Sequence, residues 1–130
     1  MSADDVFFAS RDRCMADSQF IPAFYGHLFH IAPELEPYFS RVDMGRQENM
    51  LRTALYELAD FDNFTIEKMN FWLDLSTKHH EYDIQQEHFD SWMSCMLKCV
   101  SEYDPQYNEE IEKAWNSKLE QIIALMTLMY

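Results

Sequence analysis

Residues 24–51 read FYGHLFHIAPELEPYFSRVDMGRQENML, and this stretch contains most of the signals that predict the fold. It opens within a helix pattern that is apolar most of the way round, which is typical of a helix buried on more than one side. Two prolines within five residues then predict a short irregular helix and a corner. Asp43 can cap the helix that follows, and Gln47 is a polar residue in the middle of its apolar stripe.

Helical patterns continue on both sides of this stretch. Ser2 and Ser18 are the expected caps of the two helices that precede the corner. A turn is expected at residues 60–63, followed by a helix over about residues 63–80. Asp104, which is followed by a proline, predicts the start of the last helix. The last two helices are expected to be long and antiparallel, and the whole pattern predicts six or seven helices.

Composition and charge narrow the class of protein. Hydrophobic residues make up 48% of the 130 residues and there are only two glycines, which favours an all-helical globule. A formal net charge of −13 argues against non-specific binding to nucleic acid or anionic lipid. No run reaches membrane-spanning length, and the acidic first residues do not resemble a signal peptide. We therefore expect a cytoplasmic protein with no membrane or nucleic-acid partner, whose three cysteines are buried thiols.

The stretch LDLSTKHHEYDI at residues 73–84 holds two adjacent histidines, which a helix points about 100° apart. Trp72, Leu75 and His79 are spaced three and four residues apart, so His79 continues the buried face of its helix. His80 falls beside it and is the second choice. An inward histidine, taken alone, is more often a hydrogen-bonded core residue than a ligand.

Tyr25 and Gln47 add two polar groups to buried helix faces, and each needs a hydrogen-bond partner there. Together with His79 they are expected to converge on one pocket. The set does not offer three ligands of the kind that a structural zinc needs. One imidazole opposite two hydrogen-bond donors suits a haem iron with a bound diatomic ligand.

Over nearly its whole length the sequence resembles the bacterial globins, close to single-domain bacterial globins and to the haem domain of flavohaemoglobins. The resemblance implies an all-α globin fold of six to eight helices, with a three-over-three sandwich around haem b in one domain spanning residues 1–130. It also implies that the inward histidine is the proximal iron ligand. The residues that carry the resemblance, at matching intervals, are Tyr25, Phe39, Gln47 and His79.

The resemblance further implies the roles of residues around the haem. The implied function is reversible binding of dioxygen, or of NO or CO, with Tyr25 and Gln47 as hydrogen-bond donors on the distal side. Leu51 matches the distal residue one turn after the glutamine. The apolar walls that contact the cofactor would be formed by Phe24, Phe39, Leu75, Ile84 and Phe89.

Two departures from the family bear on function. Family members that activate oxygen strongly back the proximal histidine with a tyrosine and a glutamate. The matching positions here are Phe89, which cannot hydrogen-bond, and Tyr130. The sequence also contains no reductase segment.

We therefore expect an oxygen-binding protein rather than an enzyme, as a monomer or homodimer. The alternatives are a nitric oxide dioxygenase or peroxidase-like enzyme served by a separate reductase, and a gas or redox sensor. The remaining histidines are interpreted as surface or helix-edge residues: His27, His30 and His88.

Overall fold

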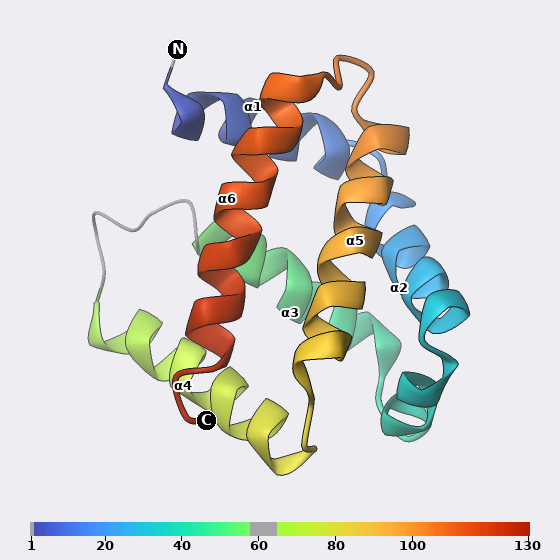
Figure 1. The fold of residues 1–130 in the computed structure, drawn as a ribbon, viewed down its shortest axis with the longest axis vertical. Coiled ribbons are helices and arrows are strands. Elements are labelled where there is room, and N and C mark those ends of the chain that lie inside the picture. The colour runs from blue at the N-terminus through green and yellow to red at the C-terminus, as the bar shows by residue number, and fades with distance from the viewer. Residues whose placement is uncertain (1, 58–64) are drawn as a thin grey trace.

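A computed structural model gives the fold of residues 2–57 and 65–130 (Figure 1). These residues form six α-helices and one 3-10 helix, and neither range contains a strand. The all-helical prediction is confirmed, while the turn predicted at residues 60–63 lies outside the described residues. In chain order the elements are α1 (Ala3–Met15), α2 (Phe20–Ile31), the 3-10 helix η1 (Pro33–Phe39), α3 (Met44–Glu57), α4 (Ile66–Glu81), α5 (Gln86–Tyr103) and α6 (Glu109–Met126).

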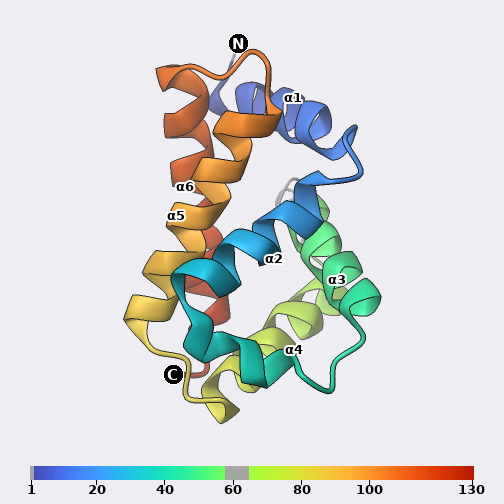
Figure 2. The same cartoon turned by 90° about the vertical axis from the view of Figure 1, so that its right-hand side faces the viewer.

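The helices are arranged in two crossing layers. α5 and α6 run antiparallel and α2 packs on α5, while α1 and α4 cross this layer near its opposite ends and α3 lies on the far side (Figures 1 and 2). η1 joins α2 to α3 and packs against α2. This arrangement agrees with the expected three-over-three sandwich. Within residues 2–57 and 65–130, no helix has the length and apolar character needed to cross a membrane.

Short polar side chains begin several helices, although not always the predicted ones. Ser2 caps α1, because its hydroxyl accepts a hydrogen bond at 3.1 Å from the backbone N–H three residues on. Asp43 caps α3 in a similar way, through the N–H two residues on, at 2.9 Å. The prediction that Ser18 caps α2 was wrong. Gln19 occupies that position, and its side chain makes no capping hydrogen bond.

Asp104 lies between α5 and α6, but it does not begin α6 as predicted. Its carboxylate is buried and accepts hydrogen bonds from Arg13 at 2.7 and 2.9 Å and from the hydroxyl of Ser10. Ser10 in turn accepts a hydrogen bond at 2.8 Å from the indole N–H of Trp115. Asn108 provides the cap of α6 instead. The side chain expected to start a helix therefore joins α1, α5 and α6 through buried polar contacts.

Packing of α1 on α6 closes one end of the sandwich. Phe7 and Trp115 are fully buried, and their ring centroids lie 4.8 Å apart in an edge-on arrangement. Burying a large apolar side chain stabilises the fold by roughly 1.5–3 kcal/mol. The three cysteines are buried and free, as expected. With this end filled by side chains, the cavity described below lies toward η1 and α4.

The contacts of Asp104 predict a pH-dependent contribution to stability. Burial raises the pKa of the Asp104 carboxyl, but hydrogen bonds from Arg13, Ser10 and a backbone N–H outweigh it and hold the pKa below its ordinary value. A carboxyl with a depressed pKa stabilises the fold above its ordinary pKa of about 3.9 and loses this contribution as pH falls through the folded-state pKa. We expect Asp104→Asn to lower the free energy of unfolding at pH 7 by about 3–5 kcal/mol. In urea titrations the difference from wild type should shrink below about pH 4.

Asp90→Asn is the matched control, because the Asp90 side chain is exposed and accepts a hydrogen bond at 3.0 Å from the exposed side chain of Gln86. Its effect on the free energy of unfolding should stay below about 1 kcal/mol. A gap between wild type and Asp104→Asn that is as large at pH 3 as at pH 7 would contradict the pKa argument.

Candidate functional site

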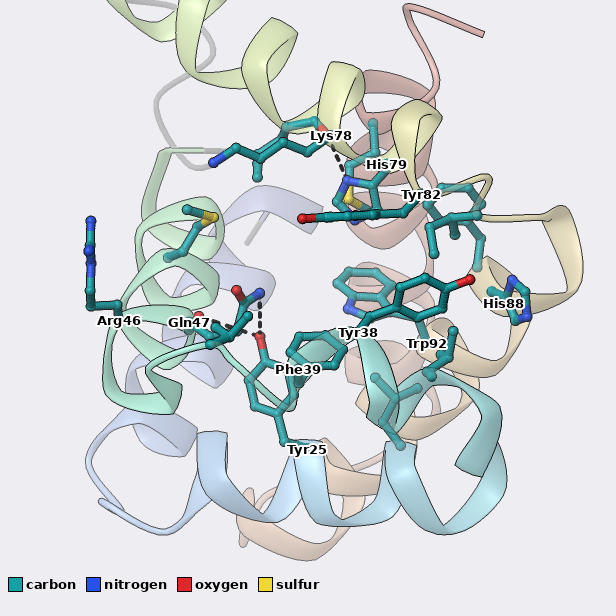
Figure 3. Close-up of a pocket in the computed structure, with 18 of the residues that line it drawn as sticks. Tyr25, Tyr38, Phe39, Arg46, Gln47, Lys78, His79, Tyr82, His88 and Trp92 are labelled. Atoms are coloured by element: carbon teal, nitrogen blue, oxygen red, sulfur yellow. Dashed lines mark hydrogen bonds between the residues drawn. The ribbon is translucent and has the colours of Figure 1, made fainter.

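A cavity of about 460 Å³ opens between α4 on one side and α2, η1 and α3 on the other (Figure 3). Its volume falls within the range of small-molecule and cofactor sites. The first residues of α5 and the end of α6 complete its walls. The apolar residues that line it are Leu28, Leu35, Phe39, Val42, Met50, Leu75, Ile84, Phe89, Trp92 and Met126.

His79 lies on the α4 wall of this cavity. Its Nδ1 is 2.6 Å from the carbonyl oxygen of Leu75, one turn earlier in the helix. Because a carbonyl oxygen only accepts hydrogen bonds, Nδ1 carries the proton and Nε2 keeps its lone pair. Burial lowers the pKa of His79 below 6.5, although the bond to Leu75 opposes this shift. The imidazole is therefore neutral at neutral pH, which is the form that binds metals.

His80, the second candidate, does not line the cavity. Its side chain is exposed, and its ring contacts Tyr130 with centroids 5.3 Å apart. The ring of His79 instead packs against Phe89, at 5.8 Å between centroids. The helical spacing that made His79 the inward residue agrees with this placement.

Tyr25 and Gln47 lie on the opposite wall, on α2 and α3, and both line the cavity. The amide Nε2 of Gln47 donates to the Tyr25 hydroxyl at 3.3 Å, and that hydroxyl donates to the backbone carbonyl of Gln47 at 3.4 Å. Both bonds are long for their type, so each donor can be redirected at small cost. Burial raises the pKa of Tyr25 to about 12, which keeps its phenol protonated and able to donate.

The predicted apolar wall is only partly assembled at the cavity surface. Phe39, Leu75, Ile84 and Phe89 line the cavity. The Phe39 ring lies 5.9 Å from that of Tyr25 between centroids, so it supports the opposite wall as well. The structure places two predicted residues behind the wall, buried in the core but outside the cavity lining: Phe24 and Leu51.

Several residues of the cavity were not predicted from the sequence. Tyr38 from η1 and Tyr82 from the turn after α4 both line it, with ring centroids 5.6 Å apart. Both come from irregular segments, where helical periodicity gives no signal. Trp92 also lines it, and its place on the stripe of α5 after Phe89 could have indicated this.

His88 was interpreted as a surface or helix-edge residue. It lies in the first turn of α5, where it also lines the cavity, and its side chain is 16% exposed. Its Nδ1 accepts a hydrogen bond at 3.0 Å from the backbone N–H of Gln85, which fixes the ring at the start of α5. The capping spacing between these two residues is the signal that could have placed it.

Three cations, Arg41, Arg46 and Lys78, line the cavity of a chain whose net charge is −13. They face the cavity from the corner before α3, from α3 and from α4. Asp43 also lines the cavity, so the cations outnumber the carboxylate by three to one. This excess of positive charge favours a ligand with anionic groups. Among the described residues, no group of three or more His, Cys, Asp or Glu side chains is placed to hold a metal ion. One imidazole, two opposed donors, apolar walls and cations together fit an iron porphyrin with carboxylate groups.

Comparisons with known proteins identify the family of this chain. The family model described as Globin matches residues 22–126. A crystal structure from Pseudomonas aeruginosa, of a protein structurally highly homologous to a human hemoglobin, is similar to this chain with a TM-score of 0.86 and 27% identity, covering 99% of this chain and 98% of that one. Among curated proteins, none matches the sequence. The resemblance to single-domain bacterial globins is therefore confirmed, and the chain belongs to the globin family.

Proposed function

We propose that this chain binds haem b in its cavity and reversibly binds dioxygen there, with NO and CO as further ligands. Membership of the globin family implies haem binding in general. The observation that supports the finer proposal is that neutral His79 and the pair Tyr25–Gln47 occupy opposite walls of one cavity. Haem, when bound, supplies an iron with open coordination positions for a histidine nitrogen and a diatomic gas.

His79 is the residue that would hold the iron, through Nε2. The carbonyl of Leu75 binds Nδ1–H and thereby sets both the tautomer and the orientation of the ring. Packing against Phe89 restrains the ring from its other side. The chain thus presents the lone pair to the cavity without needing to remove a proton near neutral pH.

Tyr25 and Gln47 would stabilise the gas ligand. Dioxygen gains partial negative charge in such sites, so donors directed at it lower its free energy. The hydroxyl of Tyr25 and the amide of Gln47 are the two donors on that wall. Their long bonds to each other leave them free to turn toward a better acceptor.

The rest of the lining would hold the cofactor and exclude water. Phe39, Leu75 and Ile84 offer apolar surface to a flat ring system. The carboxylate groups of haem b suit the three cations Arg41, Arg46 and Lys78. Because Arg41, Arg46 and Lys78 are exposed, each such ion pair contributes only about 0–1 kcal/mol. The apolar lining is therefore expected to supply most of the affinity for the cofactor.

The contacts of His79 favour a carrier over an enzyme that activates oxygen. Nδ1 binds a neutral carbonyl, and its ring neighbour Phe89 has no polar group. The hydroxyl of Tyr130 donates to the carbonyl of Ile84 at 3.0 Å, so it is engaged away from His79. A more electron-rich imidazole would need a carboxylate as partner. Rapid NO consumption by the haem-loaded chain, supplied with an electron donor, would instead favour the nitric oxide dioxygenase.

The proposal includes a cytoplasmic location. All three cysteines are free and buried, which suits a reducing compartment. Burial raises the pKa of Cys14 and of Cys99 to about 12, which keeps both as unreactive thiols.

Haem titration of His79 variants tests the ligand assignment. We expect His79→Gly to lose tight haem binding, with a loss larger than the roughly 10–100-fold that follows mutation of an outer-shell partner. Free imidazole should restore a histidine-like visible spectrum, because it can occupy the space that the side chain vacates. His80→Ala is the matched control and should titrate like wild type, since His80 lies outside the cavity lining. The reverse pattern would assign the iron to His80.

Gas dissociation rates test the two donors. A hydrogen bond to a partly charged ligand, between the neutral and the charged case, contributes about 1–2 kcal/mol. Tyr25→Phe and Gln47→Leu should therefore each speed dioxygen loss by about five- to thirtyfold. Stopped-flow measurements with CO provide the control, because bound CO gains little charge and its loss should change far less. Equal effects on the two gases would show that these residues act by shape and not by hydrogen bonding.

A further inference from the structure

The four residues that follow α6 fold back onto α4, the helix that carries His79. Figure 1 shows this end of the ribbon beside α4. The backbone N–H of Met129 donates a hydrogen bond at 2.8 Å to the hydroxyl oxygen of Ser76. Ser76 is fully buried, whereas the Met129 side chain is about half exposed. We call residues 127–130 the return segment.

A small displacement of the helix turn that contains Ser76 would also move the imidazole of His79. Ser76 follows Leu75, whose carbonyl oxygen binds Nδ1 of His79. Burying a hydroxyl oxygen without a partner costs free energy, so the bond from Met129 holds this turn of α4 in a fixed position relative to the return segment. A shift of that turn would move the Leu75 carbonyl and, with it, the orientation of the ring.

A second contact joins the return segment to the other side of His79. The hydroxyl of Tyr130 donates to the carbonyl of Ile84 at 3.0 Å, and the N–H of Ile84 donates to the carbonyl of His79 at 3.0 Å. The Tyr130 ring also lies 6.1 Å from that of Phe89, which packs on the imidazole. The return segment is therefore connected to His79 in two ways: through the turn of α4 that precedes it and through the corner that follows it.

We propose that Ser76 is a positioning residue, through which the return segment fixes the orientation of His79 toward the cavity. This inference rests on the proposed function, because the position of His79 matters only if that residue binds a ligand. Ser76 does not itself line the cavity. Its effect passes through the backbone of α4.

Amide hydrogen exchange of the haem-free chain tests the mechanical part of the proposal. Ser76→Ala should speed exchange over residues 72–81 by about two- to tenfold, because one net hydrogen bond to α4 is lost. Alanine is a better helix former than serine, so if the substitution acted only through helix propensity, exchange would become slower instead. Thr77→Ala is the matched control, since its hydroxyl bonds only within α4, to the carbonyl of Leu73 at 2.9 Å.

The iron–histidine stretching band of the reduced, haem-loaded chain tests the positioning part. Ser76→Ala and Tyr130→Phe should both shift or broaden this band, whereas Thr77→Ala should leave it unchanged. Ser10→Ala controls for general loss of stability, because it removes another fully buried serine at the α1 end of the molecule. If that variant moved the band equally, or if Ser76→Ala left it unmoved, the proposal would be overturned.

The two hypotheses fail in distinguishable ways. A wild-type chain that takes up no haem would overturn the proposed function and, with it, a role for Ser76 in positioning a ligand. A chain that binds haem through His79 while residues 72–81 exchange identically in wild type and Ser76→Ala would overturn only the inference about Ser76. Tyr130→Phe keeps the ring contacts and removes one hydroxyl, so it provides a readout even if Ser76→Ala fails to fold.

Discussion

The site depends on the separation of the two walls of the cavity, and each wall is held in place by a different neighbouring helix. α3 packs on α2, while α4 packs on α6. A helix pair that packed directly would fill the space between its walls, and His79 would then be an ordinary core residue. Holding the walls apart leaves a cavity of about 460 Å³ between them. A ligand that fills it binds only the folded state, so its binding free energy adds to stability.

Two clusters of polar side chains, one at the α1 end and one at the cavity, differ in the kind of hydrogen bonds that they make. At the α1 end, charged Asp104 and Arg13 are joined with Ser10 and Trp115, and the geometry is tight. At the cavity, the side chains that would face the iron and its gas ligand are neutral: His79, Tyr25 and Gln47. Their hydrogen bonds are local or long, as for His79 with Leu75 and for Tyr25 with Gln47. The cluster at the α1 end fixes the positions of its helices. The cluster at the cavity leaves a lone pair and two hydrogen-bond donors available for a ligand.

Periodicity predicted much of the site because helices repeat every 3.6 residues. The stripe through Trp72 and Leu75 pointed to His79, and the structure places that residue in the cavity wall. The same reasoning failed at corners. Asp104 is followed by proline, which is a strong signal for the start of a helix. Its carboxylate instead accepts hydrogen bonds from Arg13, which is 91 residues away in the chain. No local pattern contains that partner.

Helical periodicity also does not show which of the buried apolar residues line the cavity and which lie behind its wall. Phe24 and Leu75 are both buried and both lie on predicted faces, but only Leu75 reaches the cavity, since Phe24 packs against Trp92. Tyr38 and Tyr82 reach it from segments without periodicity. Similarly, Ser76 is an unremarkable helical serine until the return segment is placed against it.

The sequence by itself determined the helices, the apolar faces and the inward direction of His79, because these follow from spacing along the chain. Tertiary structure alone decided which of the buried residues line the cavity, which cations lie around it, and which segment forms a hydrogen bond with the helix that carries His79. Those features depend on contacts between residues far apart in sequence, and the geometry of such contacts is set only when the helices cross.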